Sequence, residues 1–105
     1  MIETLLNQVK ELVDLKEDDT TYDKKLTHAI KLALLEIKSY CNLVEVPDTL
    51  YPLIVEVVSQ EHKNLTSPTL LKSLKEGEVS YEFSLQKIRT RILEFKNILD
   101  HYTTL

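Results

Sequence analysis

Hydrophobic residues recur along much of this chain at the three- and four-residue spacing that places them on one face of an α-helix. The first such pattern covers residues 2–14, where apolar positions follow one another at intervals of 3, 1, 3, 3 and 1. Its members are Ile2, Leu5, Leu6, Val9, Leu12 and Val13. The polar stretch KEDDTT then interrupts the pattern, and Thr20 and Thr21 are both suitable N-caps for a second helix. We therefore expect a first helix over 2–14 and a bend after it.

The second helical pattern is the longest and runs over residues 21–41. One stripe of this helix is apolar throughout and consists of Tyr22, Leu26, Ala29, Ile30, Ala33, Ile37 and Tyr40. Leu32 and Leu35 lie outside that stripe, well round the helix at about 100° per residue. An additional apolar strip suggests contacts on two sides, and the second contact would be another subunit. The alternative, a single exposed leucine at position 35, is equally compatible with the pattern.

The third helix is expected to begin at the sequence VEVPDTLYP, which contains two prolines. Pro47 suits a first helical turn, because its missing N–H group would have no partner there. Pro52 lies five residues further on and would remove a hydrogen bond from a regular helix. We therefore predict an irregular or 3₁₀ first turn within a helix that spans 48–64 and is regular from about Leu50 to Asn64. The apolar run LIVEVV makes this the predicted central helix, although the same run taken alone is compatible with a buried strand.

The only glycine of the chain, Gly77, separates two short segments that are compatible with β-strands. After it, apolar and polar residues alternate with the period of two that is typical of a half-buried strand; the apolar ones are Val79, Tyr81 and Phe83. We expect a β-hairpin over 70–84. Its register stays open, because a two-residue turn places the residue before Gly77 at positive φ, whereas a three-residue loop avoids this and shifts the pairing by one.

A last helix is expected over residues 85–101. Apolar residues recur there at intervals of 3, 4, 3, 4 and 3, which is a heptad-like seam. The seam consists of Leu85, Ile88, Ile92, Phe95, Leu99 and Tyr102. It is too short for a free-standing coiled coil, so we expect this helix to dock onto the others. The predicted fold class is mainly α: a compact four-helix domain over residues 1–105, with one β-hairpin inserted between the third and last helices.

Composition and charge are those of an ordinary soluble globular domain. The 105 residues are 43% apolar and 29% charged, without a run of about 18 apolar residues or a leader-like start, so we expect a cytosolic protein. The net charge of −4 arises in residues 1–50, which carry 6 lysines and 10 acidic residues, whereas residues 51–105 carry 7 basic and 7 acidic residues. Binding to nucleic-acid phosphates draws on clustered Lys and Arg. We see no such cluster and do not expect the chain to grip DNA.

The residue types on which most enzymes and metal sites depend are sparse. Cys41 is the only cysteine, so no internal disulfide can form, and a lone thiol is typically a small buried hydrophobe. The three histidines, His28, His62 and His101, are far apart, and none belongs to a pair with metal-ligand spacing. A single glycine excludes the glycine-rich phosphate loops and the nucleophile elbow. We therefore expect neither a catalytic site nor a metal or other cofactor.

The order of these parts resembles a known family. An acidic bend precedes a long helix, Val46-Pro47-Asp48 opens an apolar helix, a lysine- and serine-containing stretch leads to GEVSYEFS, and the last helix carries paired arginines. Together these features resemble the head–tail connector (adaptor) proteins of long-tailed bacteriophages and prophages, over nearly the whole chain. Pro52 departs from the pattern of that family, and this departure concerns the first turn of the third helix.

The resemblance implies a structural component of the virion, at the interface of head and tail, without enzymatic activity or cofactor. Proteins of this family form a homo-oligomeric ring, expected to be a dodecamer, below the portal protein of the DNA-filled capsid. Such a ring extends the DNA channel, through which the genome passes without specific binding. It also provides the docking platform for the stopper or tail-completion protein. Assembly would take place in the host cytoplasm and involve no membrane.

Two sets of residues are candidates for the contacts that the resemblance implies. The subunit or ring interface is expected to involve Leu35 and the hairpin residues Lys72, Leu74, Lys75, Glu76, Gly77, Glu78, Val79, Tyr81 and Phe83. Docking to the portal is expected to involve Arg89, Arg91, His101 and Tyr102.

Two other functions are alternatives to the connector. One is a small helical regulatory or nucleic-acid-binding module, in which the basic residues Lys87, Arg89 and Arg91 of the last helix contact the partner. A salt-dependent gel shift would distinguish it from a connector. The other is an enzyme that uses Cys41, for which the lone thiol is the only support, and alkylation of the native protein would test it.

Overall fold

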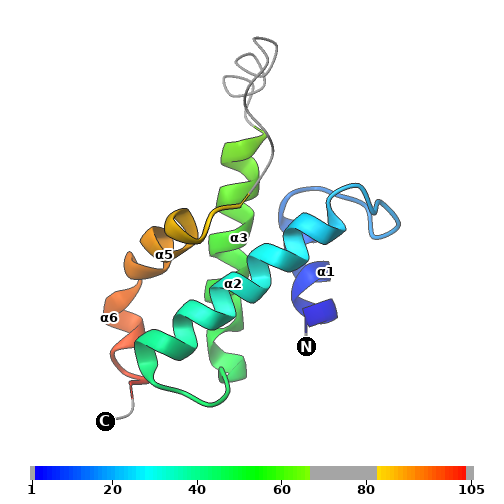
Figure 1. Cartoon of the computed structure of the whole chain (residues 1–105). Coiled ribbons are helices and arrows are strands. Elements are labelled where there is room, and N and C mark those ends of the chain that lie inside the picture. Colours follow the sequence, from blue (N-terminus) through cyan, green and yellow to red (C-terminus); the bar gives the residue numbers. More distant parts are fainter. Residues whose placement is uncertain (1, 67–82, 104–105) are drawn as a thin grey trace.

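A computed structural model of the chain describes residues 2–66 and 83–103. These residues form five α-helices and one 3₁₀ turn (Figure 1). The elements are α1 (Ile2–Leu12), α2 (Asp23–Cys41), the 3₁₀ turn η1 (Asp48–Leu50), α3 (Tyr51–Leu65), α5 (Leu85–Leu93) and α6 (Lys96–Leu99). No helix within the described ranges combines the length and apolar character needed to cross a lipid bilayer.

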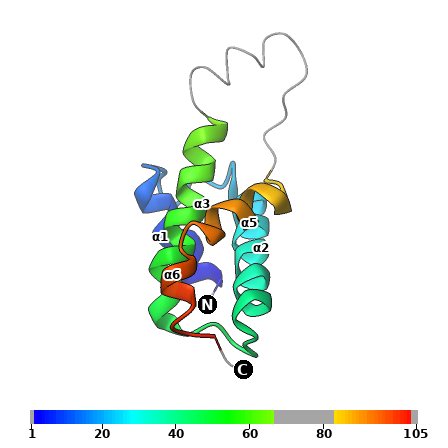
Figure 2. The ribbon, with the colours of Figure 1, turned by 90° about the vertical axis from the view of Figure 1, so that its left-hand side faces the viewer.

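Helix α3 packs against α1, α2 and α5, which is the central position expected from its apolar run. Its buried side chains belong to the hydrophobic core and include Leu53, Ile54, Val55, Val57, Val58 and Leu65. Helix α2 contributes Leu26, Ile30 and Ile37 to the same core. In Figure 2, α5 and α6 cross the face that α2 and α3 present, and both helices contact α2. The core is therefore made where helices from both ends of the sequence meet.

The predicted fold class is corrected by this structure: the described ranges contain five α-helices and no β-strand. Most of the expected hairpin, residues 70–82, lies outside the described residues, and Phe83 and Ser84 do not belong to a strand. Phe83 is only 6% exposed and packs into the helical core. The hydroxyl of Ser84 accepts a hydrogen bond from the backbone N–H of Lys87 at 3.1 Å and caps α5.

These two residues show why the alternating pattern was misleading at its end. A hydrophobic residue just before an N-cap commonly packs against the fourth residue of the helix. Phe83 and Ile88 occupy those two positions around the Ser84 cap, and both belong to the core. The apolar residue at position 83 is therefore explained by the start of a helix, a signal that alternation alone does not distinguish from a strand.

The last helix is also corrected, because it is two helices instead of one over 85–101. At Glu94 and Phe95 the backbone N–H groups bond three residues back, to Arg91 and Ile92 at 3.2 and 2.9 Å. These tighter bonds end α5 and let α6 begin at Lys96, so the heptad-like seam is not one straight line.

The shorter α6 packs against the end of α2. There, the hydroxyl of Tyr40 donates to Asp100 Oδ1 at 2.7 Å, and the Cys41 thiol lies 3.4 Å from the carbonyl oxygen of Leu99.

Helix boundaries elsewhere follow from local backbone geometry. Helix α1 ends two residues earlier than expected, because Asp14 adopts the left-handed conformation at φ 60°. Helix α2 ends at Cys41 as predicted, followed by left-handed Asn42 at φ 55°. The predicted 3₁₀ turn is present before α3, and Pro52 is the second residue of that helix, where its missing N–H costs no hydrogen bond.

Candidate functional site

The candidate interface residues divide into three groups in the structure. Those of the expected hairpin from Lys72 to Tyr81 lie outside the described residues. Phe83 is a core residue, so its side chain is not displayed to a neighbour. Leu35 on α2 is 54% exposed, which places an apolar side chain on the outer face of that helix. Of this set, Leu35 is the described residue that a partner can reach directly.

Arg89 on α5 is bound to α2. Its guanidinium donates from Nε and Nη2 to the two carboxylate oxygens of Glu36, both at 3.0 Å. The arginine side chain is 53% exposed and that of Glu36 14% exposed. This fork-shaped pair fixes α5 against α2 and partly neutralises the charge that was expected to dock a partner.

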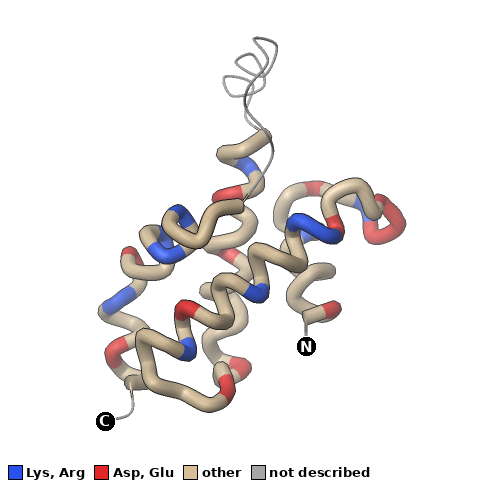
Figure 3. Tube along the Cα trace, viewed as in Figure 1, with Lys and Arg blue, Asp and Glu red and all other residues tan. Residues whose placement is uncertain are grey.

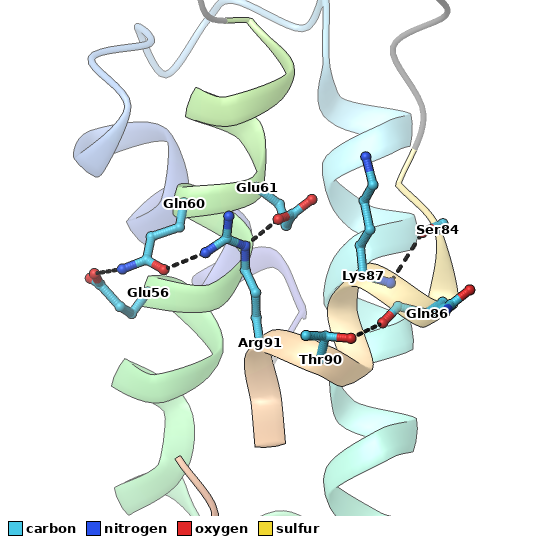
Figure 4. A network of polar contacts seen from close by, with 8 residues as sticks. All are labelled: Glu56, Gln60, Glu61, Ser84, Gln86, Lys87, Thr90 and Arg91. Carbon is cyan, nitrogen blue, oxygen red and sulfur yellow. Dashed lines mark hydrogen bonds and ion pairs between the residues drawn. The ribbon is translucent and has the colours of Figure 1, made fainter. Parts of the chain in front are cut away.

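Arg91 points to the other neighbour of α5, the central helix α3 (Figure 4). Its Nε forms an ion pair with Glu61, whose side chain is only 3% exposed, and its Nη1 donates to Gln60 Oε1 at 3.1 Å. Gln60 in turn donates from Nε2 to Glu56 Oε1 at 2.7 Å. The structure thus directs Arg89 and Arg91 to different helices and does not combine them in one basic surface.

A groove of about 520 Å³ lies beside the Arg91 network, between the end of α3 and the start of α5. Its lining is polar and consists of Glu61, Asn64, Ser84, Gln86, Lys87, Thr90, Arg91 and Glu94. The positive charges of Lys87 and Arg91 balance the negative charges of Glu61 and Glu94, so the groove has no large net charge. The Thr90 hydroxyl donates to the carbonyl oxygen of Gln86 at 2.9 Å, and the Ser84 hydroxyl caps the helix. Such an arrangement suits hydrogen bonding to a partner better than nucleophilic chemistry.

The remaining portal-docking candidates lie after α6. His101 is exposed, whereas Tyr102 is half-buried and packs against the core. The backbone N–H of Tyr102 donates to the carbonyl oxygen of Leu99 at 2.9 Å, which continues the turn beyond α6. Of these two residues, His101 is the one whose side chain projects into solvent.

Within the described ranges, the histidines and Cys41 do not come together in a metal site, and no group of three metal-ligating side chains occurs there. His62 is buried and its ring meets that of Tyr22 edge-on, with centroids 5.0 Å apart. Burial lowers the pKa of His62. Burial likewise raises the pKa of the Cys41 thiol, which keeps this buried group in its weakly nucleophilic protonated form.

A feature that the sequence analysis missed is the row of lysines along the outer face of α2. Lys24, Lys31 and Lys38 are seven residues apart and therefore leave the helix on nearly the same side. Figure 3 shows basic positions recurring along the trace of α2. The heptad spacing of the three lysines is visible in the sequence. The net charge of residues 1–50 does not reveal this row of lysines, because the acidic residues of that segment outnumber its lysines.

Comparisons with family models, curated proteins and solved structures find no match to this chain.

Proposed function

We propose that this chain is a structural head–tail connector (adaptor) of a long-tailed bacteriophage or prophage, which forms a ring below the portal. The proposal is supported by the order of sequence features from the acidic bend to the paired arginines. In this role the ring extends the DNA channel and provides the platform on which the stopper or tail-completion protein docks. The virion is its place of action, and the ring is its working form.

The observation that carries the proposal is the two-sided character of α2. This helix already contacts α1, α3, α5 and α6, and its inner face is buried. Its outer face nevertheless exposes Leu35, in a row with Lys31 and Lys38. A neighbouring subunit in a ring would cover this apolar side chain and meet the lysines around it. Leu32, the other residue of the expected second strip, instead packs against the core of its own subunit.

The chemistry of the described surface supports a binding role. The groove between α3 and α5 has balanced charge and hydroxyl groups that are engaged in helix hydrogen bonds. Cys41, the only thiol, is buried. A net charge of −4 also suits a channel that lets DNA pass without holding it.

Assembly with the portal protein tests the proposal. The purified chain, alone and mixed with a phage portal protein, is examined by native mass spectrometry and negative-stain electron microscopy. We expect ring-shaped particles, or rings seated on the portal if the free chain is monomeric. A chain that stays monomeric in both conditions and never joins portal particles refutes the connector.

The lysines of α2 favour one alternative, a helical nucleic-acid-binding module. They form a basic row, whereas Arg89 and Arg91 are engaged in ion pairs with Glu36 and Glu61. A gel shift at low ionic strength distinguishes the two functions, because binding to phosphates weakens steeply with salt. Salt-dependent DNA binding without ring formation would favour the module over the connector.

A further inference from the structure

The outer face of α2 carries positive charge that other described residues do not neutralise. Lys24 and Lys31 are exposed, about 10 Å apart along the helix axis, with exposed His28 between them. Neither lysine forms an ion pair with another residue in the described ranges. Lys38 continues the row but shares a hollow with two acidic residues, Glu45 and Asp48. The excess charge is therefore concentrated at Lys24 and Lys31.

A groove of about 490 Å³ lies beside these two lysines and is called the lysine groove below. Its lining consists of Leu6, Asp23, Lys24, Thr27, His28 and Lys31. The acidic member, Asp23, is paired with the ammonium group of buried Lys10 at 2.9 Å and does not neutralise the two exposed lysines. The groove thus combines two ammonium groups and a hydroxyl with the apolar side chain of Leu6. This combination suits a segment that carries several carboxylates.

The bend between α1 and α2 has the complementary charge. Its residues 14–19, called the acidic bend below, present three exposed carboxylates, those of Asp14, Glu17 and Asp18. Two hydrogen bonds from the flanking residues fix the conformation of the bend. Lys10 Nζ donates to the carbonyl oxygen of Glu17 at 2.9 Å, and the Thr21 N–H donates to Asp19 Oδ1 at 3.0 Å. A segment that is already ordered loses little conformational entropy when it binds.

We propose that the lysine groove of one subunit receives the acidic bend of a second copy of this chain, an inference that rests on the ring function proposed above. Lys24 and Lys31 do not pair with the acidic bend of their own subunit. Each copy therefore offers both halves of the contact to its neighbours. A contact between two different patches passes from copy to copy and closes into a ring when the rotation allows it.

The contact is electrostatic and lies at the surface, so it depends on ionic strength. Charges in solvent are screened over about 8 Å at physiological salt and over about 3 Å at 1 M. Like charges placed opposite each other across an interface cost several kcal/mol. Reversing the two lysines should therefore weaken self-association by about a hundredfold or more.

Two charge-reversal variants test the pairing. The groove variant carries Lys24→Glu and Lys31→Glu, and the bend variant carries Glu17→Lys and Asp18→Lys. A matched control carries Lys63→Glu and Lys96→Glu, two exposed lysines outside the groove, and has the same net charge of −8 as the groove variant, since each reversal changes −4 by −2. All residues changed are exposed, and circular dichroism checks that each variant is folded.

Sedimentation velocity and native mass spectrometry then measure assembly at low and high salt, with the portal present if the wild-type chain is monomeric alone. We expect the control to assemble like the wild type and each of the two variants to fail. An equimolar mixture of the groove and bend variants should assemble again with the two variants alternating, because the reversed groove of one is complementary to the reversed bend of the other, just as the two unchanged patches are. A mixture that stays monomeric, or a groove variant that assembles normally, overturns the inference.

The remaining outcomes separate this inference from the function on which it rests. A wild type that assembles while both variants also assemble leaves the ring intact and overturns only the docking of bend and groove. A wild type that never assembles overturns the connector and this inference with it. Loss of DNA binding in the groove variant, with assembly unchanged, would instead assign the groove to nucleic-acid phosphates.

Discussion

Replacing Arg91 with methionine should destabilise the fold more than removing its partner. The Glu61 side chain is only 3% exposed, and its second oxygen, Oε2, has no hydrogen-bond partner among the described residues. Arg91→Met keeps an aliphatic chain of similar reach against α3 but removes the guanidinium. The carboxylate of Glu61 is then left buried without its counter-charge, which is the costly half of a broken ion pair.

The magnitude follows from burial. Removing one partner of a buried pair costs about 3–5 kcal/mol. The lower end applies here, because Arg91 is 26% exposed and borders an open groove, so we expect about 3 kcal/mol. Glu61→Leu leaves a guanidinium that still reaches water and Gln60, and should cost about 1 kcal/mol. The double variant has neither charge and should lie within about 1 kcal/mol of the wild type.

Urea unfolding followed by far-ultraviolet circular dichroism measures these free energies of unfolding. Arg89→Met is the matched control on the same helix, since Arg89 is 53% exposed and its pair with Glu36 should be worth less than about 1 kcal/mol. If Arg91→Met costs no more than Arg89→Met, or if adding Glu61→Leu fails to restore stability, the reasoning from burial is wrong.

Three further predictions concern single residues. Ser84→Ala removes the cap of α5 and should lower the free energy of unfolding by about 1 kcal/mol, whereas Ser84→Asp should retain most of it in the same urea titration. Burial lowers the pKa of His62 below its usual 6.5, so the stability linked to its neutral ring is present above that pH and is lost as the pH falls. Thermal unfolding between neutral pH and about pH 5 should show this loss, and an equal loss in His62→Phe would contradict the assignment. The Cys41 thiol should react with iodoacetamide far more slowly in the native protein than in urea; equal rates would show that it is accessible.

The interpretation of the last part of the chain shows how far periodicity extends. Leu85 to Leu99 keep a heptad-like spacing, yet the chain tightens at Glu94 and Phe95 and begins a second helix. The periodic spacing shows only that apolar side chains fall on one face of a helix. The same spacing occurs whether the chain continues as one straight helix or turns into a second helix that also faces the core. Ile88, Ile92 and Leu99 are indeed buried, whereas Leu85, the first residue of the seam, is 38% exposed.

The ion pairs of Arg89 and Arg91 likewise could not be predicted from neighbouring positions in the sequence. Arg89 and Arg91 are two residues apart and were grouped as one docking surface, but their guanidiniums pair with Glu36 on α2 and Glu61 on α3. Those partners lie 53 and 30 residues away in sequence. A search of neighbouring positions does not find such partners.

The amino-acid sequence by itself determined what depends on neighbouring residues: the helical periods of α2 and α3, the irregular 3₁₀ start before α3, and the bend before α2. These features follow from backbone sterics and from apolar spacing within one or two helical turns. Tertiary structure alone decided which charges are neutralised, because ion pairing needs two side chains within a few ångströms, whatever their separation in sequence. It buries Phe83, binds Arg89 and Arg91 to different helices, and leaves Lys24 and Lys31 exposed beside a groove.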